Sequence, residues 1–153
     1  PASRDWVRAL GADFVVNHHE PLPAQIAALG IGAPAFVFST SHSDTYLPAI
    51  AELIAPQGRI AVIDDPATLD VNPLKSKSLS LHWEFMFTRA LWQTADIAAQ
   101  GQILREVAAL VDAGKIRTTL TERLDGINAA NLRHAHALLE RGDAIGKVVL
   151  SGW

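Results

Sequence analysis

One stretch of the chain limits its possible folds more than any other: an apolar run at residues 35–38 that stops abruptly in small polar residues. The run reads Ala-Phe-Val-Phe, and Ser39, Thr40 and Ser41 follow it. Residues 44–54 then show the spacing of an amphipathic helix. An apolar run bounded by turn residues is typical of a buried strand in a parallel sheet. Ligands of open α/β sheets bind beyond the carboxyl ends of the strands, so we expect the functional edge at residues 39–43.

A second strand repeats this design. Residues 59–63 read Arg-Ile-Ala-Val-Ile, a second predicted strand, and Asp64, Asp65 and Pro66 follow it. Further helices are predicted at residues 3–10, 23–29, 94–113 and 128–141, and further strands at 14–16, 79–87, 118–124 and 146–150. Strands and helices therefore alternate along the chain, which predicts the α/β class.

Composition excludes several kinds of function. The chain has 153 residues, a formal charge of −3 and no cysteine. It has no basic cluster for nucleic acid and no thiolate metal site or disulfide. Its apolar runs are far shorter than the roughly 20 residues that cross a bilayer. We expect one domain in the reducing cytoplasm.

Four segments, in the same order along the chain, resemble the medium-chain dehydrogenases/reductases, in the branch of zinc-type alcohol dehydrogenases and quinone oxidoreductases. They are LGADFVVN at residues 10–17, PQGRIAVI at 56–63, LHWEFMFTR at 81–89 and GKVVL at 146–150. The resemblance implies a Rossmann-like doubly wound parallel sheet. It also implies hydride transfer between NAD(P)(H) and a carbonyl, quinone or enone substrate.

The sequence departs from this family in one large respect. The family's nucleotide domain opens with a strand, a GxGxxG turn, a helix and a second strand, and this sequence contains no such unit. We therefore expect residues 1–153 to be a single partial NAD(P)-binding domain, inactive alone, with strand 146–150 returning toward an absent catalytic domain. In the strand order 3-2-1-4-5-6 the absent strands lie between strands 14–16 and 35–39, which would leave exposed apolar edges. We expect the chain alone to rearrange, to pair with another copy, or to be found beside the absent portion.

The resemblance also implies the cofactor-binding residues. Ser39, Thr40 and Ser41 would lie beside the nicotinamide ribose and the pyrophosphate. Ile63 and Asp64 would lie at the nicotinamide amide, mostly through the backbone, although the family usually has glycine at position 64. The structural alternatives are capping of the next helix at residues 39–41 and a turn before Pro66.

The resemblance extends to both ends of the cofactor. Phe87, within the apolar segment 85–88, would lie at the substrate end of the nicotinamide pocket, unless that segment belongs to a core or a dimer interface. Ser3, Arg4 and His18 fall near the family's adenosine 2′-phosphate positions, where His18 could stack on adenine or contact phosphate. These three residues favour NADP(H) over NAD(H), and their alternative is an ordinary surface role.

The sequence yields neither a metal site nor a catalytic residue. His18 and His19 are neighbours and point to opposite faces of an extended chain, and His134 and His136 diverge on a helix. No zinc ligand is therefore predicted. Ser41, His42 and Asp44 make a poor hydrolytic triad, because sequence neighbours seldom face one another and no GxSxG turn is present.

Two functions remain open at this point. The first is the C-terminal part of an NAD(P)(H)-dependent oxidoreductase, working as a homodimer through residues 79–87 on a small-molecule substrate. The alternative is a non-catalytic α/β module for dimerisation or small-ligand binding.

Overall fold

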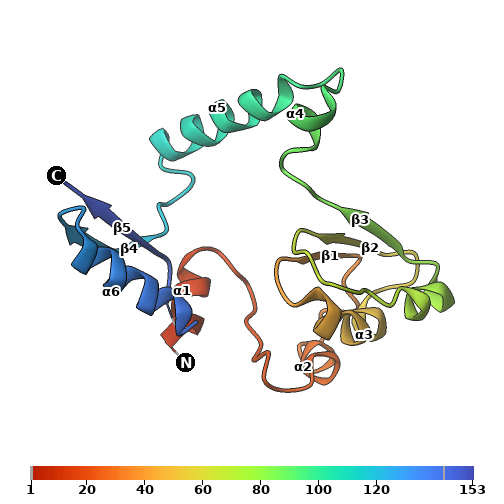
Figure 1. Cartoon of the computed structure of the whole chain (residues 1–153). Helices are drawn as coiled ribbons and strands as arrows, with labels where there is room; N and C mark the ends of the chain where they lie inside the picture. Colours follow the sequence, from red (N-terminus) through yellow and green to blue (C-terminus); the bar gives the residue numbers. More distant parts are fainter. Residues whose placement is uncertain (1, 143) are drawn as a thin grey trace. The chain divides into compact units, whose positions relative to one another are not determined.

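The computed structural model describes residues 2–142 and 144–153, and it divides the chain into two compact units (Figure 1). Unit 1 combines Pro1–Val15 with Ala98–Trp153, and unit 2 is Val16–Ile97. Each unit holds a parallel sheet with helices, so the predicted Rossmann-like α/β class is confirmed.

Unit 2 is built on a three-stranded parallel sheet. Its strands, in the spatial order β1-β2-β3, are β1 (Phe36–Ser39), β2 (Arg59–Val62) and β3 (Ser80–Trp83). Helix α3 (Ser43–Leu53) joins β1 to β2, and the 3-10 helix η1 (Asn72–Lys77) lies between β2 and β3. The last residues of the strands stand side by side, because Ser39 pairs with Val62 and Val62 pairs with Trp83. All three carboxyl ends therefore meet at one edge.

The core of unit 2 lies on one face of this sheet. Alternate residues of a strand point to opposite faces, so Ile60 and Val62 of β2 share a face and are both fully buried. They pack with Leu47, Ile50 and Ile54 of the α3 segment. On β1 the alternation leaves Phe36 and Phe38 on the other face, where they are 71% and 63% exposed. Helix α3 therefore packs against the face of the sheet that carries Ile60 and Val62.

Residues 14–16 do not form the predicted strand. A strand needs a neighbour to hydrogen-bond with, and no described strand pairs with this segment. The chain is instead fixed just beyond it, where Asn17 and Gln25 exchange two hydrogen bonds of 2.8 Å. Gln25 belongs to helix α2 (Leu22–Ala28), which was predicted at 23–29.

The predicted strand at residues 79–87 is too long. β3 ends at Trp83, because its neighbour β2 ends at Val62, and the last bond is donated by the Glu84 N–H to the Val62 carbonyl at 2.9 Å. Beyond that point the chain turns and forms the short helix α4 (Thr88–Trp92), which was not predicted.

In its described residues, unit 1 pairs two strands and carries three helices. The strands, which are parallel, are β4 (Leu120–Asp125) and β5 (Lys147–Ser151), and the helices are α1 (Ala2–Ala9), α5 (Ala99–Asp112) and α6 (Ala129–Glu140). Asn128 caps α6 as predicted, because its side-chain oxygen accepts the Asn131 N–H at 2.9 Å.

Helix α5 begins five residues later than predicted. Thr94 and Arg89 both donate to the Asp96 carboxylate, at 2.6 and 2.9 Å, and these bonds hold the preceding segment as a turn. Side chains that bond locally in this way compete with helix formation.

The strand order can be compared with the prediction that strands are absent beside residues 35–39. β1 is an edge strand of the three-stranded sheet, as predicted for residues 35–39. The described residues form one sheet of three strands and one of two, rather than a continuous six-stranded sheet. None of the described helices is long and apolar enough to cross a membrane.

We expect Val62→Ala to destabilise unit 2 by about 2 kcal/mol, because two buried methyl groups are lost and a cavity remains. Val71→Ala is the matched control, since Val71 is 51% exposed in the same unit and its loss should change stability by less than about 0.5 kcal/mol. Urea unfolding followed by circular dichroism measures both. Equal effects would contradict the placement of the core.

Candidate functional site

The candidate site begins where β1 and β2 end. The Ile63 N–H donates to the Ser39 carbonyl at 3.2 Å, so the two loops leave the sheet side by side. The sequence placed Ser39, Thr40, Ser41, Ile63 and Asp64 at this edge, and the structure brings all five to it. Their contact with a cofactor stays a prediction.

A chain of three polar side chains joins these loops. The Ser43 hydroxyl and the Ser43 backbone N–H both donate to the Asp64 carboxylate, the N–H at 2.9 Å. The oxygens of Ser39 and Ser43 lie 2.7 Å apart. A hydroxyl has one hydrogen, and that of Ser43 goes to Asp64, so the Ser39 hydroxyl donates to Ser43. Ser43 is fully buried and Ser39 nearly so.

Asp64 thereby replaces the missing cap of α3. The residue at the N-cap position, His42, is left-handed (φ 53°) and its side chain makes no capping bond. The first turn of a helix presents unpaired N–H groups and a partial positive charge, which a carboxylate stabilises. Hydrogen bonds from the Ser43 hydroxyl and then from its N–H lower the pKa of Asp64, and the charge of nearby His42 lowers it further.

This network differs from what the sequence suggested. Asp64 was expected to act mostly through its backbone, but its side chain is bonded to Ser43. Sequence reasoning did not single out Ser43. Its signal was available, because a serine at the start of a helix is a common partner for backbone and carboxylate groups.

A pocket of about 500 Å³ lies beside the end of β1. Its six lining residues are His18, His19, Ser41, His42, Thr45 and Tyr46. The rings of His18 and His19 are 4.0 Å apart and inclined at 45°. We call it the histidine pocket. The sequence had placed only His18 and Ser41 of this set at the cofactor. It had also predicted that His18 and His19 point to opposite faces, and this was wrong, because both line the pocket.

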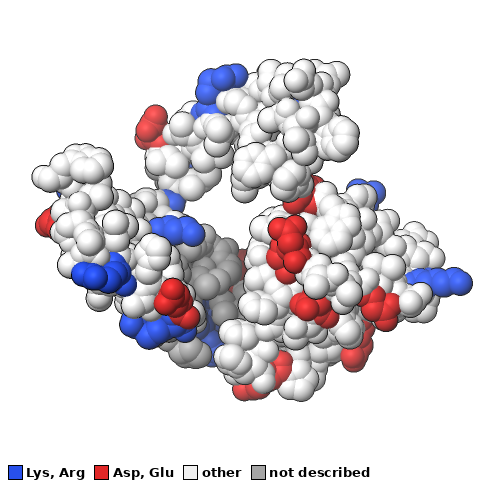
Figure 2. Space-filling view, viewed as in Figure 1, with Lys and Arg blue, Asp and Glu red and all other residues white. Residues whose placement is uncertain are grey.

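The histidine pocket differs in charge from the rest of unit 2. Residues 16–97 contain eight Asp or Glu and four Lys or Arg. Figure 2 shows many of these acidic side chains exposed on the face in view. The six residues that line the pocket include no carboxylate. An anion would therefore meet no negative side chain in the lining, although unit 2 as a whole is acidic.

A second pocket, of about 420 Å³, lies beyond the ends of β2 and β3. It is lined by Ile63, Asp65, Glu84, Phe85, Met86, Phe87 and Arg89, and we call it the phenylalanine pocket. The rings of Phe85 and Phe87 meet edge to face, 5.5 Å apart. Three consecutive apolar side chains, in a lining that also holds two carboxylates, suit a neutral ring better than an anion.

The other predicted site residues lie in unit 1. Ser3 and Arg4 are exposed on α1. The helix was predicted to begin at Ser3, as its N-cap, but it begins at Ala2, so Ser3 lies inside it. Their predicted place at the adenosine end of the cofactor stays a prediction.

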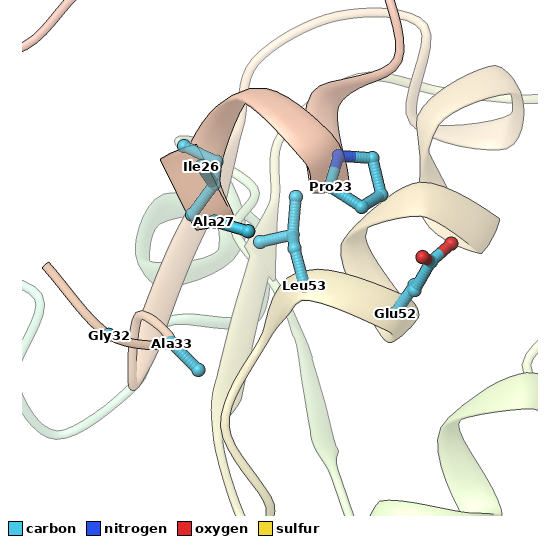
Figure 3. A pocket seen from close by; sticks show the side chains of 7 residues that line it. All are labelled: Pro23, Ile26, Ala27, Gly32, Ala33, Glu52 and Leu53. Atoms are coloured by element: carbon cyan, nitrogen blue, oxygen red, sulfur yellow. The ribbon is translucent and has the colours of Figure 1, made fainter. Parts of the chain in front are cut away.

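A third pocket, of about 370 Å³, is shown in Figure 3. It lies toward the amino ends of the strands, whereas ligands of such sheets bind at the carboxyl ends. Ile26 and Ala27 of α2 line it together with Glu52 and Leu53 at the end of α3. That helix runs back from the carboxyl end of β1 to the amino end of β2.

The described residues do not fit a zinc ion. Among residues 2–142 and 144–153, no group of three or more His, Asp or Glu side chains is placed to hold a metal. A hydrolytic role for Asp44 gains no support either, because its carboxylate accepts the Thr45 N–H at 2.8 Å.

We expect Asp64→Asn to destabilise the protein near neutral pH and to have less effect in acid. A lowered pKa means that the carboxylate stabilises the fold above the ordinary carboxyl range, and that this contribution is lost as the pH falls through the folded-state pKa. The difference in unfolding free energy between wild type and variant should therefore shrink below about pH 4.

Asp65→Asn is the matched control for this prediction, since Asp65 is exposed and adjacent. Urea unfolding at a series of pH values measures all three proteins. A constant difference between wild type and Asp64→Asn across the series would contradict the capping role.

Comparison with known proteins places this geometry in a family. Residues 10–150 match the family model described as zinc-binding dehydrogenase. A zinc-type alcohol dehydrogenase-like protein of Staphylococcus aureus strain MSSA476 is 34% identical over 148 residues, which are 96% of this chain and 44% of that protein. The chain thus spans less than half the length of this curated relative.

Solved structures agree with this assignment. A provisionally assigned zinc-dependent alcohol dehydrogenase of Rhizobium etli CFN 42 is 55% identical, with a TM-score of 0.92 over all of this chain and 45% of its own. An NAD-dependent alcohol dehydrogenase is 25% identical, with a TM-score of 0.73 over 98% of this chain and 41% of its own. The predicted resemblance is confirmed: the chain belongs to the family of zinc-binding dehydrogenases.

Proposed function

We propose that this chain belongs to an NAD(P)(H)-dependent oxidoreductase that transfers hydride to or from a carbonyl, quinone or enone substrate. The dinucleotide lies across the carboxyl edge of the three-stranded sheet. Its phosphate-rich end lies at the histidine pocket and its nicotinamide end at the phenylalanine pocket.

The observation that carries this proposal is the contrast between the two pockets. One is lined by histidines and hydroxyls without a carboxylate, and the other by consecutive apolar side chains. They open beside neighbouring strand ends of one sheet. A ligand with an anionic end and a neutral ring end matches this arrangement. The family assignment supports the same kind of ligand.

The bound nicotinamide would supply the hydride chemistry. The chain's own residues would position it: the bond between Asp64 and Ser43 holds the two loops together, and Ile63 adds an apolar side chain to the phenylalanine pocket. Phe85 and Phe87, which line the same pocket, would offer aromatic surface to the nicotinamide ring.

The proposal is tested on the purified protein, in the longest form that its gene encodes. Calorimetric titration with NADPH and NADH measures binding, and cofactor oxidation with a quinone, an enone and an aldehyde measures activity. Binding with turnover of at least one class supports the proposal. Absence of binding to both cofactors would overturn it and favour the non-catalytic module.

We expect Ile63→Asp to weaken binding of both cofactors roughly tenfold or more, because it places a charged carboxylate in the apolar lining that would contact the neutral ring. Ile63 is 43% exposed, so the fold should tolerate the change. Val71→Asp adds the same charge to another exposed position of unit 2 and should leave affinity unchanged. Calorimetry measures both, and equal losses would contradict the place given to Ile63.

We also propose a cytoplasmic homodimer that forms through β3. β3 is an edge strand, and Trp83 on it is 57% exposed. Leu81, on the same strand, packs against the core of unit 2, so it is a poor probe of this interface.

Trp83→Glu should convert the dimer to a monomer, since a charge on an apolar strand edge opposes pairing. Trp92→Glu, on α4, is the control and should stay dimeric. Light scattering gives the solution mass. A monomeric wild type, or a dimeric Trp83→Glu protein, would refute the interface.

A further inference from the structure

We propose that the face of the three-stranded sheet opposite α3 is a docking surface for the rest of the polypeptide. The segment that covers it is a helix whose apolar side lies over Phe36 and Phe38. This inference concerns the assembly of the protein and does not depend on the proposed cofactor.

The sheet of unit 2 is covered on one face only, the face on which α3 packs (Figure 1). Residues paired across neighbouring strands share a face, so Phe36 lies beside Arg59, and Phe38 lies beside Ala61. Both phenylalanines are largely exposed, whereas the residues of β2 that face α3 are fully buried. No described element therefore covers the two phenylalanines. Parallel sheets occur almost only with both faces covered, so this face lacks a layer.

The chain as a whole exposes more surface than its mass requires. Its accessible surface is 11344 Å². Two separate compact proteins, each of half its mass, would together expose about 9,100 Å². The surplus is therefore about 2,200 Å², even when the two units are treated as separate proteins. Large apolar side chains contribute to this surplus, and Phe36 is among the most exposed of them.

The size of the surplus distinguishes between two kinds of partner. A standard interface buries roughly 800 Å² on each protein, so one second copy accounts for less than half of the surplus. The chain spans 44% of its Staphylococcus aureus relative and 45% of the Rhizobium etli structure. In a polypeptide of that length, the remaining part is large enough to cover the surplus. The face of Phe36 and Phe38 therefore belongs to that part rather than to a second copy.

The side chains of this face indicate what fits it. Its large apolar side chains lie on β1, at Phe36 and Phe38, whereas β3 contributes Ser80 and His82 to the same face. The Arg59 guanidinium lies 5.9 Å from the centroid of the Phe36 ring. Helices are the elements that cover sheet faces in α/β proteins. The covering helix therefore runs over β1, with apolar side chains toward the phenylalanines and an acidic side chain beside Arg59.

The experiment is hydroxyl-radical footprinting of the wild-type protein, in the longest form that its gene encodes, read by mass spectrometry. It compares the oxidation rates of Phe36 and Phe38 in the folded protein with their rates in urea. Both rates should be at least roughly tenfold lower in the folded protein, because radicals reach a covered ring only when the structure opens locally. Val71, which is exposed at the start of η1, is the control, and its two rates should be similar.

Photo-cross-linking then identifies the covering segment. One variant of the full-length protein carries p-benzoylphenylalanine in place of Phe38, and a control variant carries it in place of Val71. Irradiation should join position 38 to a residue of the same polypeptide outside these 153 residues, without raising the mass of the denatured protein. Position 71 should not form this cross-link, because it lies outside the sheet.

Two results would overturn the proposal. Equal oxidation rates of Phe36 and Phe38 in folded protein and in urea would show that the face is open. A cross-link from position 38 to a second chain would give the face to another copy of the protein. Neither result concerns cofactor binding, so the proposed function stands or fails separately.

Discussion

The hydrogen bonds between the Asp64 carboxylate and Ser43 are the interaction on which the candidate site depends. They join the end of β2 to the start of α3, and Ser39 extends them to the end of β1. Without Asp64 the first turn of α3 would lack a side-chain cap, because His42 makes no such bond. One buried network thus fixes the helix, both loops and the spacing of the strand ends.

This arrangement has a consequence for ligand binding. The positive end of α3 is already occupied by the protein's own carboxylate, so an incoming anion has to be held elsewhere on the edge. The histidine pocket next to it offers donors without a competing carboxylate among its lining residues. The same network therefore orders the loops and directs negative groups away from the helix terminus toward the histidines.

The sequence predicted more of the fold than of the site. Segments such as residues 35–38 and 59–62 were recognisable as strands because short, mainly apolar runs that end in turn residues are typical of parallel sheets. The errors occurred where pairing decides the structure: residues 14–16 have no paired neighbour, and residues 84–87 extend past the end of β2. Hydrogen-bonding partners far along the chain cannot be read from local pattern.

Within the site, the sequence by itself determined the polar ends of two parallel strands, at Ser39 and at Asp64, because turn residues that follow apolar runs mark the carboxyl edge. Only the tertiary structure decided that Asp64 would bond to Ser43 rather than remain free, and that His42 would join His18 and His19 around one pocket. The physical reason is distance along the chain. Periodicity reports which face of an element is buried, whereas contacts between residues more than twenty positions apart are set by how whole elements pack.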